Sequence, residues 1–202
     1  MTMLQISEYI SNFPKIFSID DALAPWVITS NLNELVKKAI LLLDHEFVIK
    51  NGIAIHKTAK VEKGVSFHGP VIICANCRIG ANAYFREGVF IDRAVNIGPG
   101  SEIKSSIICS ESAVAHLNYL GNSIIGSRVN FEAGSIGANH YNERDNKAIR
   151  VKYQGNIIET GVTKFGCLVG DDSKIGANAV LSPGTILDKN SIVKRLSLVE
   201  QV

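Results

Sequence analysis

Three side chains that can carry positive charge recur at a constant spacing in the sequence. His68, Arg86 and Lys104 lie eighteen residues apart, each directly after a large apolar residue. If eighteen residues make one coil of the chain, these side chains are stacked on one face. Two cations stacked at ~5 Å repel by roughly 3 kcal/mol at an effective dielectric constant of about 20. A bound anion such as phosphate would turn this repulsion into attraction, whereas side chains that diverge into water would be screened from each other.

One histidine close to this column in sequence offers acid–base chemistry. His116 lies in the segment Ala115–Asn122, which also contains Tyr119. An imidazole titrates near neutral pH, so it can accept the proton that an attacking amine loses when it forms an amide. A single histidine can equally be a structural residue. The residue type alone leaves both interpretations open.

The elements that position these side chains follow from a six-residue period. Large apolar residues occupy nine consecutive positions of this period from Ile55 to Ile103, and small or β-branched residues follow four positions after the first eight. The period shifts by one residue at Ile108, shifts again at Ile125, and returns from Val169 onward. Neither an amphipathic helix nor an antiparallel strand pair has this period. Three short strands per coil do have it, which predicts an all-β solenoid, a parallel β-helix.

Residues 1–50 lack the period and form a separate segment. Apolar residues between Leu32 and Leu43 fall on one helical face, with Ser30 or Asn31 in position to cap the helix. A weaker helix is predicted over Leu4–Asn12 and a connecting loop over Ser18–Trp26. We therefore expect a helical N-terminal cap over residues 1–50 that covers the first coil, followed by a β-helix domain over residues 51–202.

A second interruption of the period lies within the β-helix domain, at about residues 138–165. Its second half alternates around Gln154-Gly155-Asn156, which indicates a hairpin. Long insertions into solenoids tend to be functional, because a rigid scaffold presents them. The prediction is an inserted loop and hairpin that leaves the prism as an arm.

Composition excludes several classes of protein. The chain is 46% hydrophobic and 20% charged, so it can bury a core and is not a disordered tail. A net charge of +2 gives no field that would indicate a nucleic-acid partner. The longest apolar run, Ala39–Leu43, is too short for a membrane span, and the first residues do not form a signal peptide. Four cysteines are typical of reduced thiols, so we expect a cytoplasmic protein.

The cysteines and histidines give weaker alternatives. Cys74 and Cys77 have the spacing of a redox or zinc pair, but the period places Cys77 inward and Cys74 outward, which favours structural cysteines. Cys109 is a possible acyl-enzyme nucleophile. The histidines form no close pair on one coil, so no metal site is predicted.

The segment Arg86–Ser135 resembles a known family. It is similar to the acetyltransferase domain of the bifunctional bacterial enzymes that acetylate glucosamine-1-phosphate and then uridylylate it. That family carries His-Leu-Thr-Tyr-Leu-Gly-Asp followed by Val-Asn-Ile-Gly-Ala-Gly-Thr-Ile, and His116–Asn122 and Val129–Ile136 match these motifs at the same spacing. The segment Thr160–Gly166 resembles the C-terminal domain of archaeal sugar-phosphate nucleotidyltransferases.

This resemblance covers about residues 55–195 and implies more than the period does. The general crossover rule favours a right-handed coil, but the resemblance implies a left-handed parallel β-helix. It also implies acetyl-CoA as co-substrate and a homotrimer with sites between subunits.

The resemblance also assigns roles to individual residues. His116 would be the general base, which decides between its two interpretations in favour of catalysis. The other residues would bind substrates: Arg86 and Lys104 the sugar phosphate, Tyr119, Asn130, Asn139 and Tyr141 the sugar, and Ala133 and Ala177 the acetyl-CoA arm.

The predicted function is an acetyl-CoA-dependent N-acetyltransferase that acts on an amino-sugar phosphate similar to glucosamine-1-phosphate. Two alternatives remain. The acceptor could be a nucleotide-linked sugar, because the loop after Asn139 departs from the family pattern. The chain could also be a non-catalytic trimeric scaffold or regulatory partner of a sugar nucleotidyltransferase.

Overall fold

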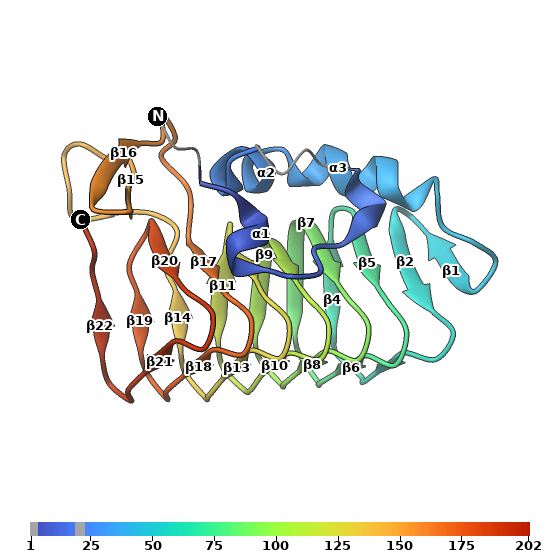
Figure 1. The fold of residues 1–202 in the computed structure, drawn as a ribbon. Helices are drawn as coiled ribbons and strands as arrows, with labels where there is room; N and C mark the ends of the chain where they lie inside the picture. Colours follow the sequence, from blue (N-terminus) through green and yellow to red (C-terminus); the bar gives the residue numbers. More distant parts are fainter. Residues whose placement is uncertain (1–3, 19–22) are drawn as a thin grey trace.

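The strands of the protein stack into a parallel β-solenoid (Figure 1). A computed structural model describes residues 4–18 and 23–202. Within these ranges a seven-stranded sheet carries one strand from each coil. Pairs such as Lys60 with Arg78, eighteen residues apart, have the predicted coil length. The β-helix prediction is confirmed.

Each coil places one strand on each of three faces, and two long strands turn a corner between faces. The first face consists of β2 (Ile53–His56), β5 (Val71–Ile73), the second halves of β7 (Tyr84–Ile91) and β9 (Glu102–Ile108), β12 (Ile124–Ile125), β17 (Cys167–Val169) and β20 (Thr185–Leu187). The second face consists of β3 (Lys60–Val61), β6 (Arg78–Ile79), β8 (Asn96–Ile97), β10 (Ala113–Val114), β13 (Asn130–Phe131), β18 (Lys174–Ile175) and β21 (Ile192–Val193). The third face consists of β4 (Ser66–His68), the first halves of β7 and β9, β11 (Tyr119–Gly121), β14 (Ile136–Gly137), β19 (Val180–Leu181) and β22 (Leu198–Val199).

The large apolar residues of the six-residue period fill the interior of the prism. Phe85, Ile103 and Phe131 are fully buried and belong to one continuous cluster. Cys77 lies in the same cluster, whereas Cys74 packs outside it, as the period predicts. Stacked apolar side chains therefore hold successive coils in register.

The shifts of the period correspond to two coils of seventeen residues, as in the pairing of Ile107 with Ile124. Serine hydroxyls close the two short corners. Ser106 Oγ donates to the Lys104 carbonyl at 2.7 Å and accepts the Ser123 N–H at 3.0 Å, and Ser123 Oγ donates to the Gly121 carbonyl at 2.8 Å. These bonds satisfy backbone groups that would otherwise be buried without partners. The corner after Lys104 is thereby held in a defined conformation.

The N-terminal segment contains α1 (Ile6–Tyr9), η1 (Lys15–Phe17), α2 (Pro25–Ser30) and α3 (Leu32–Ile40). These helices lie along the side of the stacked coils (Figure 1). Trp26 and Leu32 share a core with Ile72, Phe90 and Ile107, which point outward from the first face. The prediction that the helices cover the first coil is wrong, because it overlooked the apolar outer surface of this face.

The first coil is covered by a strand. β1 (Phe47–Lys50) pairs antiparallel with β2 and so satisfies its exposed edge. Pro25 begins α2, where a loop was predicted over Ser18–Trp26; residues 19–22 of that loop lie outside the described residues. No described helix has the length and hydropathy of a membrane span.

The predicted hairpin is present as β15 (Arg150–Tyr153) and β16 (Asn156–Glu159). The insertion does not project as an arm but folds back over the first face (Figure 1). Phe165 packs edge-to-face on Trp26 with ring centroids 5.9 Å apart, and the Tyr153 hydroxyl donates to Glu8 at 3.0 Å. The insertion and the N-terminal helices therefore share one core.

Candidate active site

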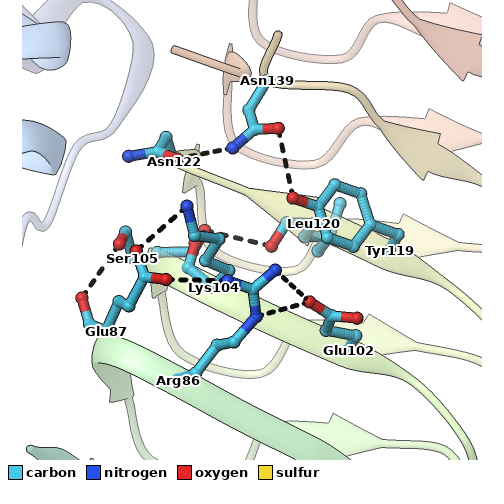
Figure 2. Close-up of polar contacts among 10 residues, drawn as sticks. Arg86, Glu87, Glu102, Lys104, Ser105, Tyr119, Leu120, Asn122 and Asn139 are labelled. Carbon is cyan, nitrogen blue, oxygen red and sulfur yellow. Dashed lines mark hydrogen bonds and ion pairs between the residues drawn. The ribbon is translucent and has the colours of Figure 1, made fainter. Parts of the chain in front are cut away.

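Four of the predicted site residues lie together on the third face (Figure 2). Direct pairing of β4 with β7 and of β7 with β9 stacks His68, Arg86 and Lys104 in register, which confirms the predicted column. Tyr119 lies on the next coil, and Asn139 follows β14.

Carboxylates of the same chain neutralise this column. Glu87 lies 2.7 Å from Arg86 and 3.0 Å from Lys104, and Glu102 lies 2.7 Å from Arg86. The cations therefore do not diverge into water but are paired with acidic side chains. Lys104 is only 4% exposed, and its pairing with Glu87 offsets the cost of burying the ammonium group.

The two cations keep Glu87 ionised. Partial desolvation of its carboxyl raises the pKa, but the hydrogen bond from Lys104 and the charges of Lys104 and Arg86 outweigh this effect. The pKa of Glu87 is therefore below its ordinary value. At neutral pH the cluster of Arg86, Glu87, Glu102 and Lys104 contains two positive and two negative groups.

A chain of amide and hydroxyl groups continues from the column. The Tyr119 hydroxyl donates to Asn139 Oδ1 at 3.1 Å, and Asn139 Nδ2 donates to Asn122 Oδ1 at 2.6 Å (Figure 2). The Asn122 N–H donates to the Lys104 carbonyl at 2.8 Å. Burial, and then the charge of Glu102, raise the pKa of Tyr119, so the phenol stays neutral and can act as a hydrogen-bond donor. Such groups suit the hydroxyls of a sugar.

His116 lies on the corner between the second and third faces, three residues before Tyr119, and its side chain is exposed. Ala133 and Ala177 occupy the same corner on the next two coils. Backbone bonds of 3.0 Å from Gly134 to the His116 carbonyl and from Asn178 to the Ala133 carbonyl show this stacking. The structure therefore aligns the predicted base with both residues predicted to contact the acetyl-CoA arm.

Asn130 and Tyr141 lie apart from the polar cluster. Asn130 is exposed on β13, where it lines a groove of about 500 Å³ on the second face. Tyr141 is 5% exposed, and its hydroxyl donates to the Pro183 carbonyl at 2.9 Å. The Arg144 guanidinium lies 3.6 Å from the centre of the Tyr141 ring. In this chain Tyr141 packs the inserted loop, and its hydroxyl is already bonded.

An ion pair that sequence reasoning missed crosses the corner next to Ala177. Glu132 stands where the family motif has glycine, and it accepts two bonds from Arg195, at 2.7 and 2.8 Å, and one from the Ala177 N–H at 2.8 Å. The hydrogen bonds from Arg195 and from the Ala177 N–H lower the pKa of Glu132 to about 2. Glu132 and Arg195 are 63 residues apart in the sequence, so their spacing does not predict the pair. The one signal in the sequence is that Glu132 replaces the glycine of the family motif.

Cys109 does not join the site. Its side chain is fully buried, and burial raises the pKa of the thiol well above its ordinary value. A buried neutral thiol is a poor nucleophile, which argues against an acyl-enzyme at this position.

Curated relatives share the sequence of this chain over most of its length. The bifunctional protein GlmU of Methanococcus vannielii is 33% identical over 183 residues, which cover 88% of this chain and 43% of the relative. A bifunctional sugar-1-phosphate nucleotidylyltransferase/acetyltransferase of Sulfurisphaera tokodaii is 35% identical over 136 residues, 67% of this chain and 33% of the relative. The chain thus spans less than half the length of these relatives.

Among solved structures, one match is the perosamine N-acetyltransferase of Caulobacter crescentus, crystallised as a mutant with CoA and GDP-perosamine. It is 17% identical, with a TM-score of 0.30 over 69% of this chain and 52% of that one. An overlap this weak carries no argument about the present site. The family model described as the GMPPB C-terminal domain matches residues 48–158, more than half of the chain. This chain therefore belongs to the GMPPB C-terminal domain family.

Proposed function

We propose that the chain is an acetyl-CoA-dependent N-acetyltransferase that acts on an amino-sugar phosphate. The observation that carries this proposal is the arrangement around β11. His116 stands on the corner before this strand, in line with Ala133 and Ala177, and the polar cluster with Lys104 lies on the face beyond it. The relative named as a sugar-1-phosphate nucleotidylyltransferase/acetyltransferase supports acetyl transfer in this proposal.

In the proposed reaction, each group has one task. Acetyl-CoA would supply the acetyl group and leave as the thiol when the amine nitrogen bonds to the carbonyl carbon and the C–S bond breaks. His116 accepts the proton that the amine loses and returns it to the departing sulfur. Tyr119 and Asn139 orient the sugar hydroxyls, and Arg86 and Lys104 hold the phosphate, which places the amine near His116.

The residues of the corner fit an extended acetyl-CoA arm in one respect and oppose it in another. Ala133 and Ala177 have small side chains on successive coils, about 4.8 Å apart as stacked strands are. The Glu132–Arg195 pair reaches across the same corner and already uses the Ala177 N–H. Binding along this corner therefore requires that the pair moves or that the arm passes beside it.

The proposal is tested by measuring thiol release from acetyl-CoA with a panel of acceptors. The panel contains amino sugars with and without phosphate and a nucleotide-linked amino sugar. Release that is fastest with the amino-sugar phosphate supports the proposal. If release is fastest with the nucleotide-linked sugar, that sugar and not the amino-sugar phosphate is the acceptor. If no acceptor gives release, the chain is better explained as a non-catalytic scaffold.

Lys104→Ala should raise the KM for a phosphorylated acceptor by tenfold or more and change the KM for the unphosphorylated sugar little. A charge-assisted bond to phosphate contributes about 1.5–3 kcal/mol, and only the phosphorylated acceptor makes it. Lys38→Ala, an exposed lysine on α3, is the control and should change neither KM. Equal effects of Lys104→Ala on both acceptors would mean that the column does not bind phosphate.

We further propose that the enzyme is a homotrimer in which the corner of one subunit that carries His116 faces the polar cluster of its neighbour, so that His116 and Asn139 reach each site from different subunits although both lie beside β11 in every chain. His116→Ala and Asn139→Ala proteins, each inactive, should then recover about a quarter of wild-type activity when unfolded and refolded together, because random cyclic trimers rebuild about one site in four. Sedimentation checks that trimers form. A mixture that is trimeric but inactive would show that the two residues do not act across a subunit boundary.

A further inference from the structure

Glu87 differs from the other charged groups of the cluster in its exposure. Its side chain is 53% exposed, whereas the Lys104 side chain that it contacts at 3.0 Å is 5% exposed. Among the described residues Lys104 has no other ion-pair partner. The carboxylate of Glu87 therefore lies between Lys104 and the solvent from which an acceptor would arrive.

A bulge positions this carboxylate. Pairing between β7 and β9 is regular up to Arg86, opposite Lys104, and resumes at Val89 after a register shift. Glu87 adopts φ +62°, the left-handed conformation that Ser105 and Asn122 also take at this corner on the next two coils, and Ser105 Oγ donates to its carbonyl at 2.9 Å. A bulge re-aims the side chain that it carries.

The start of α3 holds the bulge in place. Gly88 follows Glu87 with φ +89°, and a Cβ atom there would lie 2.6 Å from the Asn33 backbone nitrogen. The helix therefore packs directly on the backbone of Gly88. Because the backbone is fixed, Glu87 can release Lys104 only by rotating its side chain, which its exposure allows.

Glu102 cannot take the same part. Its one ion pair among the described residues is with Arg86, at 2.7 Å, and it makes none with Lys104; it lies on β9, which is paired on both sides. If Glu87 rotates away, Arg86 and Lys104 keep one counter-charge instead of two. The cluster then has a net charge of +1 and an accessible ammonium group, which suits an anion.

We propose that Glu87 is an internal competitor for the acceptor's phosphate and so sets the affinity and specificity of the site. Its carboxylate occupies the anion position in the free enzyme and turns into solvent when phosphate binds to Arg86 and Lys104. This inference rests on the proposed function, because it takes the column as the site of the acceptor's phosphate. An acceptor without phosphate leaves Glu87 in place.

The test is the affinity of the full chain for inorganic phosphate, measured by calorimetry in the wild type, Glu87→Gln and Glu111→Gln. Glu111 is a matched control: it has φ +63° and pairs with Arg93 at 2.9 Å. Glu87→Gln should bind phosphate about tenfold more tightly, because the competing charge is gone. Glu111→Gln should bind it as the wild type does. Unchanged or weaker binding by Glu87→Gln overturns the proposal, as does equal tightening in Glu111→Gln.

A second variant and a second readout keep the outcomes separate. Glu87→Asp, whose carboxylate is one methylene short of Lys104, should also tighten phosphate binding and replaces Glu87→Gln if that variant does not fold. In the acetyl-transfer assay, Glu87→Gln should lower the KM for the phosphorylated acceptor only. If no acceptor is acetylated but phosphate binding tightens as stated, the proposed function fails while the role of Glu87 holds. If an acceptor is acetylated but Glu87→Gln binds phosphate as the wild type does, the role of Glu87 is refuted and the proposed function stands.

Discussion

Replacing His116 with alanine is expected to lower the turnover of acetyl transfer by about 10²–10⁴-fold, which is the usual contribution of a general base. The side chain is exposed on a corner of the prism, so its removal leaves the buried core intact. Steady-state kinetics give the turnover, and the thermal midpoint should match that of the wild type.

His45→Ala provides the control for this experiment. His45 is also exposed, with 87% of its side chain accessible, and lies between α3 and β1, away from the corner. Its replacement should leave turnover unchanged. If His116→Ala turns over as fast as the wild type, another group takes the amine proton and the assignment of the base is incorrect.

The second large effect concerns stability. Phe165→Ala should lower the free energy of unfolding by about 3–5 kcal/mol, as expected for a fully buried phenylalanine. Phe165 is 0% exposed, packs on Trp26, and its N–H donates to the Asn139 carbonyl at 3.1 Å. The loss should therefore loosen both the contact with the helices and the segment that carries Asn139. Denaturant unfolding measures the first effect, and the KM for the acceptor measures the second.

Ile157→Ala is the matched control on the same insertion. Ile157 lies on β16 and is 56% exposed, so its replacement should change stability by no more than about 0.5 kcal/mol. If Phe165→Ala is as stable as Ile157→Ala, the insertion is not part of the core that joins the helices to the first face.

Fold class and coil length were predictable because a β-solenoid repeats one local solution. Every coil needs a large inward residue at the same place, so positions such as Phe85 and Ile103 reveal the architecture without knowledge of distant contacts. The stacking of Arg86 on Lys104 followed from the same period. The roles of His116 and Asn139 came from family resemblance, and they remain proposals.

The placement of the N-terminal helices was not predicted correctly. The outward residues Ile72 and Phe90 are eighteen apart and apolar, which is a signal that this face is covered. The six-residue series of inward residues does not include these two positions, so it does not predict that the face is covered. The same oversight led to the prediction of a projecting arm, whereas the insertion uses Phe165 to cover the remainder of this face.

The sequence by itself determined the prism and the column of Arg86 and Lys104, because both follow from residues repeated at the coil length. Only the tertiary structure decided which acidic side chains pair with the column and how His116 aligns with Ala133 along one corner. Glu87 reaches Lys104 because a bulge turns its backbone and α3 holds that bulge, and neither contact follows from spacing. A periodic pattern specifies which residues share a face, but the direction of a side chain at an irregular position depends on packing from distant segments.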